Sequence, residues 1–268
     1  MALSTKKVRL SKNKSSITKG QLWRARQKQQ ASERYISMRG RHGFLVITNR
    51  GKEMQGTNEV LSWLDDQPDE AKKSEREDEE EEIDLQKLVE KEVEIAQQER
   101  QKRRMFDVGL DCLQLVKTET DPLVLIQRLV HEITTNPDSS LIHVDKIIPF
   151  QVITHPTFDA ISLGVKHLLM HFLSQQPTPG DSFALALRFR GGDGGFSRDE
   201  LLSKLADVCI TCRGGSEPWK VNLTSPSVVI GVEVVRGIAG LFVTQGEEYR
   251  QFKKFHIRGL IAGEDEGL

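Results

Sequence analysis

The sequence predicts an α+β protein built from two compact modules, with a basic arm in front and an acidic insertion in the first module. Three observations lead to this prediction. The chain has 268 residues, which is enough for two small domains. Runs of β-forming residues alternate with amphipathic helical stretches from Gly43 onward. Charge is segregated along the chain, although the formal net charge is only -1.

Two segments of opposite charge are predicted to lie outside the folded modules. Residues 1–42 form a basic arm, in which Glu33 is the only acidic residue. Residues 66–82 form an acidic insertion with an unbroken acidic run from Asp78 to Glu82. Because like charges repel and few apolar side chains are available to bury, we expect both segments to be disordered, or in the arm partly helical.

The first module is predicted to span residues 43–153. Its strand and helix patterns cover 43–48 (strand), 53–64 (helix), 105–108 and 111–117 (strands), a helix opened by Asp121 and Pro122, and 144–152 (strand). Asp121 is placed to cap that helix, with Pro122 at its first position. Residues 83–104 predict an exposed charged helix. The order β-α-β-β-α-β is that of a ferredoxin-like α+β unit.

The second module is predicted to span residues 154–257, followed by a disordered tail over 258–268. Its elements are a helix over 158–172, a strand over 183–190, a helix that starts at Ser197, and strands over 228–235 and 238–243. Ser197 and Glu200 have the spacing of a capping box. The two last strands are joined by a tight turn at Arg236 and Gly237.

Candidate metal and redox residues are few. Cys209 and Cys212 have CxxC spacing, but zinc needs four ligands and no second CxxC or paired histidines lie nearby. His167 and His171 would share one helix face, without a HExxH glutamate or an evident third ligand. We interpret these residues as ordinary thiols and histidines, with an enzyme that uses the two cysteines kept as a minor alternative.

The glycine-rich turn from Gly191 to Gly195 lies between a strand and a helix, as a dinucleotide-binding loop does. It lacks the third glycine of GxGxxG, and no Walker lysine follows it. We therefore interpret it as a flexible turn. The functional alternative is that its N–H groups, the helix start at Ser197 and the flanking Arg190 and Arg198 bind a nucleic-acid phosphate.

The remaining composition narrows the class of protein. No window approaches the roughly 20 apolar residues that a membrane span needs. The three cysteines are too few for a disulfide framework, which fits a reducing compartment. We expect an intracellular protein in the nucleus or nucleolus, with the cytoplasm as the alternative. The sequence has no cofactor motif, nucleophile elbow, metal-ligand set or catalytic carboxylate pair, so we expect no enzyme activity, cofactor or small-molecule substrate.

Three stretches of the second module are similar to the THUMP domain, a fold attached to enzymes that modify transfer RNA. They are FALALRFRGGDGGFSRDEL from Phe183, KVNLTSPSVVIGVEV from Lys220, and GIAGLFV from Gly237. Further matches, from Gly43 to Asn49, Arg103 to Cys112 and Tyr249 to Phe255, resemble the family of THUMP domain-containing protein 1. In place of the asparagines usual in that family, this chain has Gly191 and Gly192 after the basic residue of the turn.

The resemblance implies a function without catalysis. Members of that family bind transfer RNA and help a separate RNA cytidine acetyltransferase to make N4-acetylcytidine in the D-arm of serine and leucine transfer RNAs. The RNA-binding residues expected here are Arg188, Arg190, Ser197, Arg198, Lys220, Asn222, Arg236, Lys253 and Lys254. The basic arm is a further RNA contact, or else a nuclear or nucleolar address or an aid to solubility. The acidic insertion is a solvated segment or else a face for a basic partner protein. The alternative function is a general RNA-binding scaffold in ribosome biogenesis, whose acidic insertion and tails bind proteins.

Overall fold

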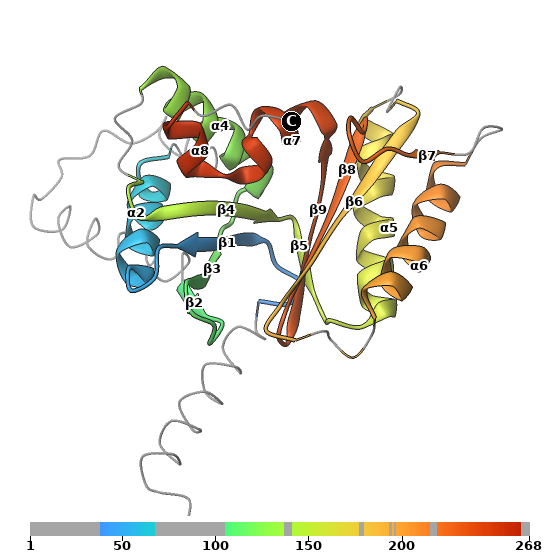
Figure 1. The fold of residues 1–268 in the computed structure, drawn as a ribbon, viewed down its shortest axis with the longest axis horizontal. Coiled ribbons are helices and arrows are strands. Elements are labelled where there is room, and N and C mark those ends of the chain that lie inside the picture. The colour runs from blue at the N-terminus through green and yellow to red at the C-terminus, as the bar shows by residue number, and fades with distance from the viewer. Residues whose placement is uncertain are drawn as a thin grey trace, which may run out of the picture.

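The computed structural model describes residues 38–67, 105–136, 141–176, 180–192, 195, 197–214 and 219–263. The predicted charged helix over 83–104, almost all of the acidic insertion and most of the basic arm lie outside the described residues. The described residues form two sheets (Figure 1). Buried apolar side chains of both sheets belong to one shared core.

The first unit is a sheet of four antiparallel strands in the order β2-β3-β1-β4. Two helices pack against it, and the Trp63 indole Nε1 donates to Glu132 Oε2 at 2.7 Å to join them. The elements are β1 (Gly43–Thr48), α2 (Glu53–Asp65), β2 (Met105–Asp107), β3 (Leu113–Lys117), α4 (Pro122–Thr135) and β4 (Val144–Phe150).

The second unit is a sheet of five strands in the order β5-β9-β8-β6-β7, with β6 parallel to both β8 and β7. Helices α5 and α6 cover the face of this sheet that is turned away from the first unit (Figure 1). The elements are β5 (Val152–Thr154), α5 (Phe158–Gln175), β6 (Ser182–Arg190), α6 (Arg198–Arg213), β7 (Lys220–Val221), β8 (Val228–Val235) and β9 (Ile238–Gln245).

Both predicted helix caps are present. Asp121 Oδ1 accepts a hydrogen bond from the Leu123 backbone N–H at 2.7 Å, with Pro122 in the first turn. Ser197 Oγ accepts one from the Glu200 N–H at 3.1 Å. The Glu200 carboxylate pairs with Lys204 Nζ at 2.6 Å, which is one turn along α6. The local signals therefore fixed where α4 and α6 begin.

One prediction at the junction of the units needs correction. The strand expected over 144–152 is two strands in different sheets, because the chain turns at Gln151. The Gln151 N–H donates to Leu241 O at 2.9 Å and its side-chain Oε1 accepts from Val243 N–H at 2.8 Å, which attaches the turn to β9. The two-residue strand β7 was not predicted, because it is too short to show a pattern.

The ordered part of the chain was predicted to be too short at both its N-terminal and its C-terminal end. Met38 is fully buried, and Arg39 Nη2 donates to Gly237 O at 2.7 Å, so order begins inside the expected arm. The expected disordered tail from residue 258 is wrong for the described residues. The chain continues through α7 (Gly246–Gln251), η2 (Lys253–Phe255) and α8 (Ile257–Ile261). Helix α8 lies beside α4 on the first unit (Figure 1).

The second sheet is buried on both faces, which explains the continuous apolar runs of β8 and β9. On β8, Val228, Ile230, Val232 and Val234 pack with α5 and α6. The alternate residues Val229 and Val235 pack in the core shared with the first unit. Side chains alternate between the two faces of a strand, so the face turned toward the first unit is set by every second residue.

Candidate nucleic-acid interface

Strand β6 changes from apolar to basic along the face that is turned toward the first unit. Ala186 packs in the shared core, whereas Leu185, Leu187 and Phe189 belong to the core under α5 and α6. Arg188 and Arg190 follow Ala186 at two-residue steps, so they share its face. The Arg188 side chain is 60% exposed and that of Arg190 is 24% exposed.

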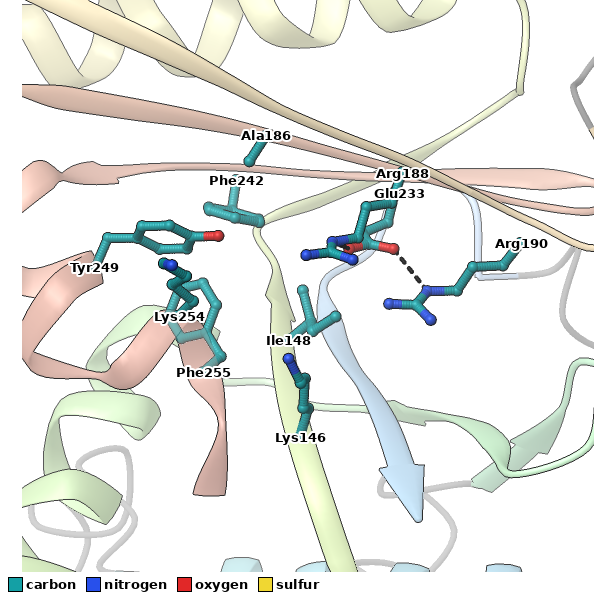
Figure 2. A pocket seen from close by; sticks show the side chains of 10 residues that line it. All are labelled: Lys146, Ile148, Ala186, Arg188, Arg190, Glu233, Phe242, Tyr249, Lys254 and Phe255. Atoms are coloured by element: carbon teal, nitrogen blue, oxygen red, sulfur yellow. Dashed lines mark hydrogen bonds and ion pairs between the residues drawn. The ribbon is translucent and has the colours of Figure 1, made fainter. Parts of the chain in front are cut away.

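These arginines line a hollow between the two sheets that contains about 330 Å³ of space, part of it open to solvent. Figure 2 shows the basic groups entering it from both units. The residues that line the hollow are Lys146, Ile148, Ala186, Arg188, Arg190, Glu233, Phe242, Tyr249, Lys254 and Phe255.

Glu233 is the acidic residue of the hollow and is only 4% exposed. Its Oε2 lies 2.8 Å from Arg190 Nε, and its Oε1 lies 3.9 Å from Arg188 Nε. Burial raises the pKa of Glu233 above its usual range, although the positive charges of Arg190, Arg188 and Lys146 act in the opposite direction. Arg190 satisfies the buried carboxylate, as a charge inside a protein requires.

Most of the RNA-binding residues expected from the sequence lie near this hollow. Arg188, Arg190 and Lys254 line it, and Lys253 precedes Lys254 in the same turn. The Arg236 N–H donates to Arg190 O at 3.3 Å, so the β8–β9 turn lies beside the end of β6. Ser197 and the exposed Arg198 begin α6, a few residues after β6 ends.

Lys220 and Asn222 lie elsewhere. Lys220 pairs with Ser182, the first residue of β6, which is eight residues before Arg190 and therefore roughly 26 Å from it along the strand. The Asn222 side chain organises its own loop. Its Oδ1 accepts from the N–H groups of Thr224 and Ser225, both at 3.0 Å, and its Nδ2 donates to Ser225 O at 3.0 Å.

Three polar residues of the hollow, Lys146, Glu233 and Tyr249, were not predicted as site residues from the sequence. Lys146 lies on β4 of the other unit, and Tyr249 lies on α7. Glu233 had a usable signal, because it is the one charged residue in the apolar run Val228–Val235. A carboxylate in a strand buried on both faces needs a cationic partner. Its register opposite Arg188 on β6 brings it within reach of Arg190, its close partner, only in the folded sheet.

The cysteine pair, Cys209 and Cys212, lies on α6, where burial affects both thiols. Burial raises the pKa of Cys209 to about 12, and burial also raises the pKa of Cys212. The thiolate, which is the nucleophile and metal ligand, is therefore disfavoured at both positions at neutral pH. Within the described ranges, no three His, Cys, Asp or Glu side chains gather as a metal site requires. Among the helices that the structure describes, none is long and apolar enough to cross a membrane.

Comparisons with known proteins locate a family within the chain. The sequence pattern of the THUMP domain matches residues 156–244. The uncharacterized protein C25H2.10c of Schizosaccharomyces pombe is 25% identical over 219 residues, which cover 78% of this chain and 73% of that protein.

Two solved structures are also similar. One is PH1313 from Pyrococcus horikoshii, with 13% identity, a TM-score of 0.47 and coverage of 76% of this chain; the match spans only 54% of PH1313. The other is the THUMP domain of THUMP domain-containing protein 1, with 27% identity, a TM-score of 0.25, and coverage of 32% of this chain and 86% of that domain. The sequence match over residues 156–244 shows that the second unit of this protein contains a THUMP domain.

Proposed function

We propose that this protein is a transfer-RNA-binding adaptor that presents serine and leucine transfer RNAs to a separate RNA cytidine acetyltransferase. The product would be N4-acetylcytidine in the D-arm, and this chain would have no catalytic step of its own. The observation that supports RNA binding most directly is the row of basic residues on one face of the THUMP domain, continued by Lys146 of the first unit.

The first unit supports the proposal through its topology. Its element order β-α-β-β-α-β and its sheet order β2-β3-β1-β4 fit the ferredoxin-like unit that the sequence resemblance implies. Met38 and Arg39 connect the end of the basic arm to both units. In our proposal the arm adds phosphate contacts or directs the protein to the nucleus or nucleolus.

The binding mode follows from the chemistry of the surface. Lysine and arginine neutralise phosphates and release counterions, so binding depends steeply on salt. If about six to ten phosphates are contacted, affinity falls on the order of 10³-fold or more between 50 and 200 mM salt. Apart from Tyr249, the hollow offers aromatic rings that are buried in the core, which favours recognition of folded RNA by shape over stacking on single bases.

The proposal is tested in cells that lack this protein. We expect N4-acetylcytidine to disappear from their transfer RNA, as measured by mass spectrometry of purified nucleosides, and to return when the wild-type gene is restored. The variant Arg188→Ala with Arg198→Glu should fail to restore it, whereas Lys166→Glu, on α5 across the sheet, should restore it. Glutamate is avoided at Arg188 and Arg190, because it would put a second carboxylate beside the buried Glu233.

Two results would reject the proposal. An unchanged level of N4-acetylcytidine in the transfer RNA of the deficient cells would show that the protein is not the adaptor. Cross-linking that recovers ribosomal RNA without transfer RNA would favour the alternative, a scaffold in ribosome biogenesis.

A further inference from the structure

The hollow between the sheets combines charges that neither unit has alone. Lys146 comes from β4, Arg188 and Arg190 come from β6, and Lys254 comes from η2. Glu233 is the one acidic side chain that lines it. With four cations and one carboxylate, the formal charge of the lining is 4 − 1 = +3.

We propose that this hollow holds one phosphate group of the bound RNA and that Glu233 is the positioning residue that orients Arg190 toward it. The proposal rests on the proposed function, because it takes RNA as the ligand. It goes further by assigning one phosphate to a site built from both units, so that RNA binding requires them to keep their present relative position.

The geometry of the arginines fits a phosphate. Arginine has a planar fork of donors that matches phosphate oxygens. Since the Nε of Arg190 pairs with Glu233 at 2.8 Å, its two terminal amino groups are the donors left for a ligand. Figure 2 shows the Tyr249 hydroxyl and the Arg188 guanidinium pointing into the hollow from opposite sides, with the Lys146 ammonium group rising from β4.

The backbone beside the hollow is held in an unusual conformation. Lys253, Lys254 and Phe255 have φ values of 48°, 55° and 65°, which lie in the left-handed region. Side chains with a Cβ rarely adopt this region. The buried Phe255 ring, which packs edge-on to Phe242 at 5.2 Å between centroids, holds the turn in place. Lys254, the middle residue of this turn, lines the hollow.

A change of Glu233 tests the proposal, because the two possible roles of its carboxylate predict opposite changes in RNA affinity. If the carboxylate acts only as a negative charge, it repels a phosphate, and Glu233→Gln should strengthen RNA binding. If the carboxylate orients Arg190, Glu233→Gln should weaken RNA binding. We expect Glu233→Gln to weaken the binding of a serine transfer RNA transcript about tenfold, the loss typical of one charge-assisted hydrogen bond. Stronger or equal binding would overturn the positioning role.

A double-mutant comparison shows whether Glu233 acts through Arg190. In a protein that already has Arg190→Ala, we expect Glu233→Gln no longer to weaken binding, because there is no guanidinium left to orient. The same tenfold loss in both backgrounds would contradict the proposal. Circular dichroism and thermal unfolding of each variant check that the fold is kept.

Lys146 tests the site without altering the buried pair. We expect Lys146→Ala to weaken binding of the same transcript and to lower the slope of log affinity against log salt by about 1. The matched control is Lys166→Ala on α5, which covers the opposite face of the second sheet and should leave affinity and slope unchanged. If Lys146→Ala behaves like this control while the wild-type protein still binds, the hollow is not a phosphate site and the proposed function stands. If the wild-type protein does not bind the transcript, both fail.

Discussion

Phe150 and Gly240 are in direct contact where the two units meet: the Phe150 ring, at the end of β4, occupies the space that a side chain on Gly240 of β9 would need. Phe150 is fully buried. The absence of a Cβ therefore lets the first sheet approach the second closely enough to share a core. The hollow described above depends on the same approach, because Lys146 lies on the strand that Phe150 ends.

We expect Gly240→Ala to destabilise the protein by about 1–3 kcal/mol, the usual cost of overfilling a packed core. Urea unfolding followed by circular dichroism measures this change. The variant Phe150→Leu should compensate in part, so that the double variant loses less stability than the sum of the two single changes. Strict additivity of the two losses would show that the ring and the glycine do not interact.

Two variants at Ser197 distinguish its structural role as a helix cap from a contact with RNA. Its hydroxyl caps α6, so Ser197→Ala should cost about 1 kcal/mol of unfolding free energy. Ser197→Asp should keep the cap and most of this stability, since aspartate also accepts from the helix N–H groups. The added negative charge should nevertheless weaken RNA binding if a phosphate lies near the start of α6. Equal RNA affinity of the wild-type and Ser197→Asp proteins would place the contact elsewhere.

Lys220 and Arg198 test how far the RNA surface extends. We expect Arg198→Ala to lower the salt slope of RNA binding by about 1, because this exposed cation at the start of α6 would lose one phosphate contact. Lys220→Ala should leave the slope unchanged, since Lys220 pairs with the opposite end of that strand. Titrations at several salt concentrations measure both. If both variants lower the salt slope equally, the RNA-binding surface extends along the whole of β6.

Cys209 should make the fold sensitive to alkaline pH. Its pKa is raised by burial to about 12, whereas the thiol of the unfolded chain ionises near 9. Below pH 9 both states keep the proton. Between pH 9 and 12 only the unfolded state loses it, so stability falls by about 1.4 kcal/mol per pH unit. Chemical unfolding at pH 8 and pH 10 should show a smaller loss for Cys209→Ala. Parallel losses in both proteins would contradict the shifted pKa.

The sequence predicted those elements whose signals are local. Asp121 with Pro122, and Ser197 with Glu200, mark helix starts within four residues, and both caps formed. It missed the break at Gln151, because the residues around it remain β-forming and only the attachment to Leu241 and Val243 turns the chain into the second sheet. It also missed α8, whose partners lie in α4 and β4 more than a hundred residues earlier.

The amino-acid sequence by itself determined most of the strands and helices between residues 43 and 245, the position of the THUMP domain, and the presence of Arg188 and Arg190 on one strand. These depend on periodicity, capping and motif spacing, which are properties of neighbouring residues. Only the tertiary structure decided that Lys146, Glu233 and Lys254 meet those arginines, and that Lys220 does not. Such residues are brought together by long-range packing, here by the contact of Phe150 with Gly240. A pattern of neighbouring residues does not show which distant residues will lie close together in the fold.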